Sequence, residues 1–319
     1  MPASLHLDAD RPGGPLRVGR CAVYVGTCSW ADPNFVKEGA FYPRGVRNDP
    51  ERRLRYYADV FPTVEVDATY HALQPPERAA KWVAWTPEGF LFSAKAFALF
   101  TWHETDPRRL PPPIQALLPP ALAAAATVSA AQLPDEVLHA VWDYYAAFIG
   151  EFSRAGRLAH VLFQFPKGRG YTTELFEHLD RWEPYLRSWP VAVEVRHREW
   201  LDEPRRAELL GYLRRKGYAY VIPDMIQQAY LPPNDVELTA PWSVVRFHGR
   251  NPAMLERRAP TNRVYDYTYG EDELRPWVQT VREMSAQVER IYLLFNNHYR
   301  GKSAKNAQEL AAMLGGAGA

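Results

Sequence analysis

Carboxylates and a histidine stand near the ends of several short apolar runs in this sequence. They are Glu65, Asp67, Glu194, Asp224 and His248. Such groups transfer protons when neighbouring charges adjust their pKa values to the reaction. We expect these residues to supply acid–base catalysis, with Asp67 and Glu194 as the first candidates for a general base.

Cationic and amide side chains occupy matching positions in other runs. Lys95, Arg196 and Arg246 are the cations, and Gln164 and Asn296 are the amides. Arginine presents a planar fork that matches a carboxylate or phosphate, whereas lysine supplies a compact charge. This set predicts a small anionic, above all phosphorylated, ligand that the amides orient. Isomerase, lyase and phosphoester hydrolase chemistry all stay open.

Aromatic residues are expected at the rim of the same site. Trp30, Tyr70, Trp102 and Trp200 follow or border the runs, where their rings could stack on a base or a sugar, or else pack the loops together. His103 stands in the loop after the third run, a type of segment in which binding residues concentrate. We include Trp30, Tyr70 and His103 among the substrate-binding candidates.

A metal centre is an alternative interpretation of the acidic residues. Its ligands would be Asp67, Glu194, Asp224 and His248, with His71 or His197 nearby. The sequence lacks a compact spacing such as His-Glu-x-x-His, and the cationic neighbours would repel a divalent ion. We predict no cofactor and keep a divalent metal ion as the alternative. Dinucleotide, P-loop and serine-hydrolase fingerprints do not occur either.

The overall charge argues for a local anion site and against a general one. The 319 residues include 38 Lys and Arg against 37 Asp and Glu, a net charge of +1, so no global basic field attracts nucleic acid. Nucleic-acid binding through the same site, with Arg257 and Arg258 beside it, remains an alternative. By fold analogy such a protein would resemble the DNA-repair barrel endonuclease IV. A non-catalytic interaction protein with self-paired interior charges is a third interpretation.

The same sequence indicates a cytoplasmic protein. Two cysteines, Cys21 and Cys28, cannot build a disulfide framework, which suits a reducing compartment. The N-terminus carries acids and no apolar core of a signal peptide, and no run is long enough to span a bilayer, so we predict no membrane association. The oligomeric state stays open.

Strands alternating with helices must position these residues. Eight β-branched and aromatic runs are candidate strands: 23–28, 64–69, 90–95, 161–165, 191–196, 219–224, 244–248 and 291–296. Helices are expected between them, among them Pro50–Val60 behind the capping residue Asp49, and Glu203–Lys216 ending at Gly217. Eight such units predict a (β/α)8 TIM-type barrel, with an open doubly wound sheet as the alternative.

Alternation along the strands predicts where the polar side chains point. One parity of a barrel strand faces the helices and the other faces the axis. In the second run Val64 and Val66 share one parity and Glu65 and Asp67 the other. The polar members lie toward the C-terminal strand ends, where barrels of this class carry their active sites.

The predicted boundaries form one domain. We expect an N-terminal extension over residues 1–22, the barrel over 23–314 and a tail over 315–319. Two insertions follow the third and seventh strands. The first is a Pro- and Ala-rich excursion over 108–133, ahead of a helix over about 134–154, and the second covers 249–270.

Motifs along most of the chain resemble one known family. They are Gly26-Thr27-Cys28-Ser29-Trp30, Phe41-Tyr42-Pro43, Val64-Glu65-Val66-Asp67-Ala68-Thr69-Tyr70, Phe92-Ser93-Ala94-Lys95, Phe163-Gln164-Phe165-Pro166, Glu194-Val195-Arg196-His197, Arg246-Phe247-His248-Gly249-Arg250 and Phe295-Asn296-Asn297-His298. In this order they resemble the YecE-like family, a domain of unknown function numbered 72. The resemblance implies a TIM-type barrel and supplies no reaction. The family commonly has Asn at the position of Asp67 and Phe-Tyr at Tyr70-His71, which favours Glu65 or Glu194 as the essential carboxylate.

Overall fold

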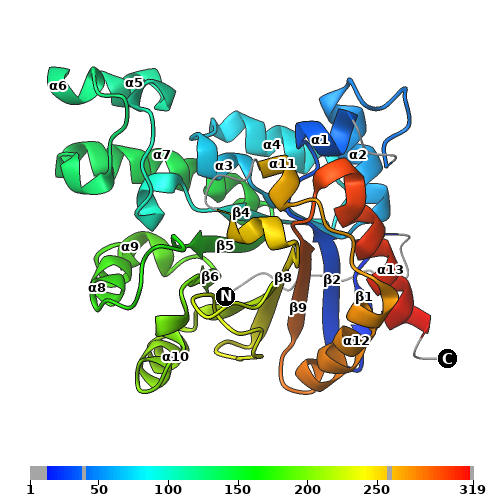
Figure 1. Cartoon of the computed structure of the whole chain (residues 1–319). Coiled ribbons are helices and arrows are strands. Elements are labelled where there is room, and N and C mark those ends of the chain that lie inside the picture. Colours follow the sequence, from blue (N-terminus) through cyan, green and yellow to red (C-terminus); the bar gives the residue numbers. More distant parts are fainter. Residues whose placement is uncertain (1–12, 38–40, 257–260, 317–319) are drawn as a thin grey trace.

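Eight parallel strands close into a barrel at the centre of the molecule (Figure 1). The structure is a computed structural model that describes residues 13–37, 41–256 and 261–316. The barrel strands are β2 (Cys21–Thr27), β3 (Thr63–Val66), β4 (Leu91–Lys95), β5 (Leu158–Gln164), β6 (Val191–Glu194), β7 (Ala219–Met225), β8 (Trp242–Gly249) and β9 (Arg290–Phe295). Each pairs with the next, and β9 pairs with β2 to close the cylinder. The predicted (β/α)8 TIM-type barrel is confirmed.

Helices pack around the barrel, and the predicted caps explain several of their ends. The longer ones are α2 (Pro50–Val60), α4 (Pro76–Trp85), α7 (Asp135–Arg154), α8 (Glu174–Arg181), α10 (Arg205–Lys216), α12 (Glu271–Ser285) and α13 (Lys302–Gly316). Short helices α1 (Pro33–Lys37), α3 (Ala68–His71), α9 (Glu183–Leu186) and α11 (Thr261–Val264) lie in the connections. Asp49 caps α2 by accepting hydrogen bonds from the backbone N–H groups of Glu51 and Arg52.

Helix α10 ends as the sequence predicts but begins later. Gly217 adopts the left-handed conformation (φ 69°) that closes a helix at little cost. At the other end the helix starts at Arg205 instead of Glu203, and the carboxylate of the preceding Asp202 pairs with Arg198 at 3.3 Å.

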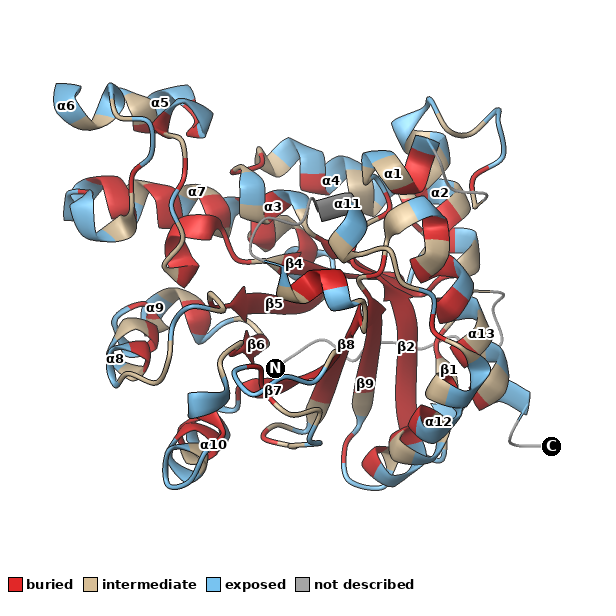
Figure 2. Ribbon diagram, viewed as in Figure 1, coloured by how far each residue is buried: buried red, intermediate tan, exposed pale blue. Residues whose placement is uncertain are grey.

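Two apolar layers divide the side chains of the strands. Tyr24, Leu162, Val221 and Tyr292, with smaller residues, fill the inside of the barrel. Residues of the opposite parity, such as Val64, pack between the strands and the helices. Figure 2 shows the barrel strands buried along almost their whole length, whereas the helices keep exposed outer faces. Because the two parities separate in this way, any polar residue of interior parity projects toward the barrel axis.

Both predicted insertions are present. After β4 the chain passes through η1 (Ala98–Thr101), η2 (Pro107–Arg109), α5 (Pro112–Gln115), α6 (Pro120–Ala123) and η3 (Ala130–Gln132) before α7. In Figure 1, α5 and α6 stand away from the barrel above α7. After β8 come η5 (Pro252–Leu255) and α11. Arg257 and Arg258 lie outside the described residues.

The two ends of the described chain pack on the barrel. Strand β1 (Leu16–Val18), within the predicted N-terminal extension, pairs antiparallel with β2. Helix α13 continues to Gly316, two residues into the predicted tail. Among the described helices, none combines the length and apolar character that crossing a membrane requires.

Candidate functional site

Arg246 lies at the bottom of the barrel mouth between two carboxylates. Its Nε and Nη2 atoms donate to Oε2 and Oε1 of Glu65 at 3.0 and 2.6 Å, and its Nη1 donates to Oε2 of Glu194 at 2.6 Å. These side chains, from β8, β3 and β6, are at most 1% exposed. The interior-parity prediction is correct for all three. They form an inner layer that solvent does not reach.

The charged groups of the inner layer pair with one another. Burial raises the pKa of Glu65, and the adjacent Arg246 counteracts this effect. For Glu194 burial acts in the same direction, but Arg246 and His248 outweigh it and the pKa falls well below its usual range. A bidentate guanidinium–carboxylate pair keeps both partners charged in such surroundings. With their oxygens already engaged, Glu65 and Glu194 are poorly placed to act as general bases.

His248 is held neutral beside Glu194. Its Nε2 atom lies 3.1 Å from Glu194 Oε1 and its Nδ1 atom 3.1 Å from Asn296 Nδ2. An amide nitrogen donates, so Nδ1 accepts and Nε2 carries the hydrogen that it donates to Glu194. The ring is fully buried, which lowers its pKa to about 4. This geometry favours a positioning role for His248 over the predicted acid–base role.

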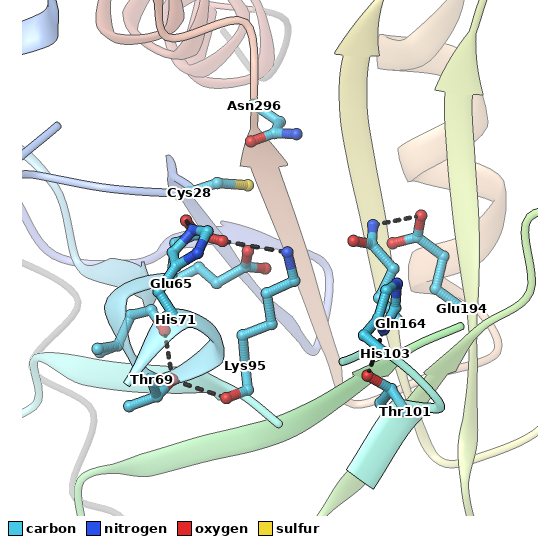
Figure 3. Close-up of polar contacts among 12 residues, drawn as sticks. Cys28, Glu65, Thr69, His71, Lys95, Thr101, His103, Gln164, Glu194 and Asn296 are labelled. Carbon is cyan, nitrogen blue, oxygen red and sulfur yellow. Dashed lines mark hydrogen bonds and ion pairs between the residues drawn. The ribbon is translucent and has the colours of Figure 1, made fainter. Parts of the chain in front are cut away.

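Gln164 and Asn296 lie above the inner layer and are bound to it on one side only. Gln164 Nε2 donates to Glu194 Oε1 at 2.8 Å, and Asn296 holds His248 as described. Figure 3 shows Lys95, Gln164 and Glu194 extending from neighbouring strands with their polar ends on the same side. The carbonyl oxygens of both amides make no hydrogen bond to a described residue, which leaves them for a ligand.

Lys95 and Asp67 form an ion pair at the edge of the mouth. Lys95 Nζ lies 3.1 Å from Asp67 Oδ1, and His71 Nε2 lies 3.3 Å from Asp67 Oδ2. Asp67 directly precedes α3, so His71 returns beside it one turn later. Burial disfavours ionisation of Asp67, but Lys95 and His71 outweigh it and lower its pKa. The carboxylate is 35% exposed, which makes it the reachable acid of this cluster.

Arg196 follows β6 and is the least satisfied cation of the mouth. Its side chain is 11% exposed, and its Nε lies 3.5 Å from Glu194 Oε1, too far and poorly aligned for a hydrogen bond. The guanidinium donates no hydrogen bond to any residue in the described part of the chain. A largely buried group with five N–H donors normally finds acceptors. Arg196 therefore has the donors that an anionic ligand would use.

Tyr70 and His103 border this cluster as predicted. The Tyr70 ring lies 4.3 Å from Lys95 Nζ and packs edge-on against the His103 ring at 5.2 Å. His103 Nδ1 lies 3.0 Å from Thr101 Oγ1 (Figure 3). Burial, followed by the charges of Lys95 and Arg196, lowers the pKa of His103 to about 4. The imidazole is thus neutral beside the cations.

Two of the predicted rim aromatics, Trp30 and Trp200, are buried, and a third, Trp102, is half-buried. Trp30 is 6% exposed and lies edge-on against Trp82 of α4, between the barrel and its helices. Trp200 is 1% exposed, and Trp102, at a left-handed φ of 61°, packs against Phe165. Trp30 does not lie at the rim as predicted, because its ring packs in the apolar layer between the strands and the helices.

Asp224 does not point into the barrel, and its predicted placement was wrong. Its carboxylate accepts hydrogen bonds from Arg250 at 2.9 and 2.6 Å, from the Tyr269 hydroxyl at 2.8 Å and from Trp277 Nε1 at 2.8 Å. Trp277 belongs to α12, on the outside of the sheet. The interior residues of β7 include Val221, so Asp224 has the outward parity, and the register of β7 shifts immediately after it.

The candidate metal ligands do not converge. Asp224 lies in the outer layer, and His197 accepts a hydrogen bond from the backbone N–H of Glu199 in its own loop. Within residues 13–37, 41–256 and 261–316, no three His, Cys, Asp or Glu side chains are grouped so as to hold a metal ion.

Sequence reasoning missed Lys167 and the pair Asp32–His298. Lys167 follows β5 in the turn Pro166–Arg169, and burial together with the charge of Arg196 lowers its pKa to about 8. His298 Nε2 lies 3.8 Å from Asp32 Oδ2 in the loops after β9 and β2. Both features lie within four residues of the C-terminal end of a predicted strand, close to the positions that hold the other candidate residues. A search extended four residues beyond each run would have included them.

The charges of the described mouth residues leave a positive excess. Glu65 and Glu194 against Arg246 give the inner layer one negative charge. Lys95, Arg196 and Lys167 against Asp67 give the outer layer two positive charges, so the whole cluster carries one. The excess lies on the solvent side, where an anion would approach.

The fold and this polar mouth define a TIM-type barrel with its candidate site at the C-terminal strand ends, and comparison with known proteins identifies the family. Residues 24–319 match the family described as "Protein of unknown function DUF72", to which this chain belongs. The UPF0759 protein YunF of Bacillus subtilis is 26% identical over 298 residues, covering 92% of this chain and 94% of YunF.

Solved structures of the same family are similar in fold. A DUF72 family protein of Thermotoga maritima MSB8 is 27% identical, with a TM-score of 0.70, covering 92% of this chain and 98% of its own. One from Enterococcus faecalis V583 is 23% identical, with a TM-score of 0.73, covering 92% and 95%. The family resemblance predicted from the motifs is confirmed.

Proposed function

We propose that this protein is an enzyme that binds a small phosphorylated ligand in the barrel mouth and transfers protons on it. The observation that carries the proposal is the state of Arg196, whose largely buried guanidinium donates no hydrogen bond to a described residue. Since a planar fork matches two oxygens of a phosphate, a phosphoryl group would satisfy these donors.

The neighbouring groups divide the remaining tasks. Lys95 contributes a second positive charge, and the free carbonyl oxygens of Gln164 and Asn296 accept hydrogen bonds from ligand hydroxyls. Asp67 is the reachable carboxylate and serves as the acid–base group. When a bound anion draws Lys95 toward itself, Asp67 loses part of its stabilising charge and its pKa rises toward the ordinary range. Ligand binding thereby makes Asp67 a better proton acceptor.

Titration with inorganic phosphate tests the proposal. At constant ionic strength we expect phosphate to raise the Tm and to give a saturable heat signal. The substitution Arg196→Gln should weaken binding by about tenfold or more, as expected for the loss of a charged hydrogen bond. Arg198→Gln is the matched control, because Arg198 lies two residues later, is 50% exposed and pairs with Asp202. Equal phosphate affinity in both variants would contradict the proposal.

A single-stranded oligonucleotide in the same titration distinguishes the nucleic-acid alternative. A protein that neutralises several phosphates loses affinity steeply as salt rises, whereas a one-phosphate site changes little. We expect the second behaviour. A third result, in which no phosphate compound binds at low salt, would favour a non-catalytic protein with self-paired interior charges.

A further inference from the structure

Two lysines border the barrel mouth, and their environments differ. Lys95 is paired with Asp67 at 3.1 Å, and although burial alone would lower its pKa, that carboxylate raises it, so the ammonium stays charged. Lys167 forms no hydrogen bond or ion pair with a described residue. Active sites often contain two groups of the same type whose pKa values are shifted in opposite directions. One group then provides a fixed charge and the other takes part in the reaction.

The backbone around Lys167 forms a hydrogen-bonded turn. The N–H of Phe165 donates to the carbonyl of Glu194 at 2.9 Å, and the N–H of Arg169 donates to the carbonyl of Pro166 at 3.2 Å, which closes a turn around Lys167. Arg169 also stacks on Trp102 at 5.1 Å. Lys167 therefore lies in a hydrogen-bonded turn that follows β5, beside the end of β6.

The charges that act on Lys167 suit an amine nucleophile. Strands β5 and β6 pair with Gln164 opposite Glu194, so Lys167 and Arg196 leave adjacent strand ends. Burial and the neighbouring positive charge of Arg196 both favour the neutral amine, while Glu194 counteracts them weakly. Desolvation and an adjacent cation are the two established ways in which proteins activate a lysine toward carbonyl compounds.

We propose that Lys167 forms an imine with the carbonyl group of the phosphorylated ligand, whose phosphoryl group lies on Arg196. This inference rests on the proposed function and narrows its substrate class to phosphorylated aldehydes or ketones. The neutral amine adds to the carbonyl carbon to give a carbinolamine. The carbinolamine then loses water, which consists of the former carbonyl oxygen and the two hydrogens of the amine, and a C=N bond remains. Protonation of the imine nitrogen gives the iminium ion. The iminium withdraws electrons from the adjacent carbon, which a proton-transferring carboxylate can then deprotonate.

Reductive trapping with pyridoxal 5′-phosphate tests the inference. This probe carries both an aldehyde and a phosphate, and borohydride converts its imine into a stable secondary amine that peptide mass spectrometry locates. At pH 8 about half of an amine with a pKa of about 8 is neutral, against under ~1% for an ordinary lysine. We expect Lys167 to be labelled at least about tenfold faster than Lys305, whose side chain is 66% exposed.

Two matched comparisons separate the amine from the anion site. Pyridoxal without the phosphate should label Lys167 about tenfold more slowly, and Arg196→Gln should remove the difference between the two probes. The Lys167→Met variant should keep the Arg196-dependent binding of inorganic phosphate, weakened only by the loss of one neighbouring charge, while losing the rapid label. Circular dichroism on each variant establishes that it is folded.

The possible failures are distinguishable. Labelling that follows exposure, or that falls on Lys95, overturns the imine while Arg196-dependent phosphate binding leaves the proposed function intact. Rapid labelling of Lys167 by both probes equally overturns the phosphorylated substrate class. Loss of phosphate binding in the parent protein together with unselective labelling overturns both proposals.

Discussion

Arg246 and Glu65 form a bidentate ion pair across the centre of the barrel, with N–O distances of 3.0 and 2.6 Å between residues 181 positions apart in the chain. Glu194 receives the third donor of the same guanidinium. Two carboxylates thus share one fully buried cation. This arrangement links β3, β6 and β8 below the mouth and forms the floor on which the reachable residues lie.

Removing that cation should cost stability. Arg246→Met leaves two buried carboxylates without their principal partner, and breaking a buried pair costs about 3–5 kcal/mol. Urea unfolding at pH 7 measures the change. Arg52→Met is the control, since Arg52 is 67% exposed and its loss should cost below about 0.5 kcal/mol. Replacing Glu65 by Leu together with Arg246→Met should recover part of the loss. A single Arg246 variant as stable as the Arg52 variant would show that the pair is not structural.

Asp224 offers a test of the boundary between scaffold and site. Asp224→Ala removes the acceptor shared by Arg250, Tyr269 and Trp277, so we expect a loss of about 2–4 kcal/mol in unfolding free energy. Because the carboxylate faces α12, phosphate affinity should equal that of the parent. Asp235→Ala, at a 52% exposed position, is the control for stability. An Asp224→Ala variant with the stability of the parent but a different phosphate affinity would show that Asp224 belongs to the ligand site.

The sequence predicts the barrel well because the same strand-and-helix pattern occurs eight times along the chain. Each of the eight expected runs overlaps a strand, and a misplaced boundary, such as the end of β3 at Val66 instead of Thr69, does not change the order of elements. Asp49 and Gly217 mark helix ends through local chemistry that depends on few distant contacts.

The candidate site is less predictable because it depends on parity and on distant partners. Glu65 and Arg246 have the expected interior parity, but only the folded chain shows that they neutralise each other. Asp224 has the outward parity of Ile222, and a single-position error reverses the direction of a side chain. Lys167 lies beyond the end of its strand, where alternation no longer applies. Its distinction from Lys95 comes from Asp67 and Arg196, which no spacing in the sequence relates to it.

The pair Lys95–Asp67 predicts a pH dependence at the acid end. The folded pKa of Asp67 lies below its unfolded value of about 4, so this carboxylate contributes stability above pH ~4 that is lost as the pH falls through the folded pKa. Asp67→Asn should lower stability at pH 7 by under about 2 kcal/mol, since the carboxylate is 35% exposed and solvent screens the pair. The two proteins should converge in stability as the pH falls below about 4. Parallel stability curves for the two proteins from pH 7 to 3 would contradict the ion pair.

His160 provides the converse case inside the barrel. The ring is fully buried between Trp242 and Tyr292, at centroid distances of 5.4 and 5.1 Å, and neither ring nitrogen has a hydrogen-bond partner among the described residues. Burial lowers its pKa from 6.5 to about 3. Between these two pH values His160 is therefore protonated in the unfolded chain and neutral in the folded chain. The stability that a neutral His160 retains above pH 6.5 is therefore lost progressively as the pH falls toward 3.

His160→Leu removes this titration and the two unsatisfied nitrogens together. At pH 8 we expect the variant to be as stable as the parent or more so, because no hydrogen bond is lost. Between pH 8 and pH 5 its advantage should grow by about 2 kcal/mol, the free energy of protonating one histidine in the unfolded chain alone. Urea unfolding at both pH values measures the difference, and His160→Phe repeats it with a ring that preserves the stacking. Since both substitutions eliminate the same proton, an advantage that does not change with pH in either variant would mean that His160 is protonated in the folded barrel and has an acceptor there.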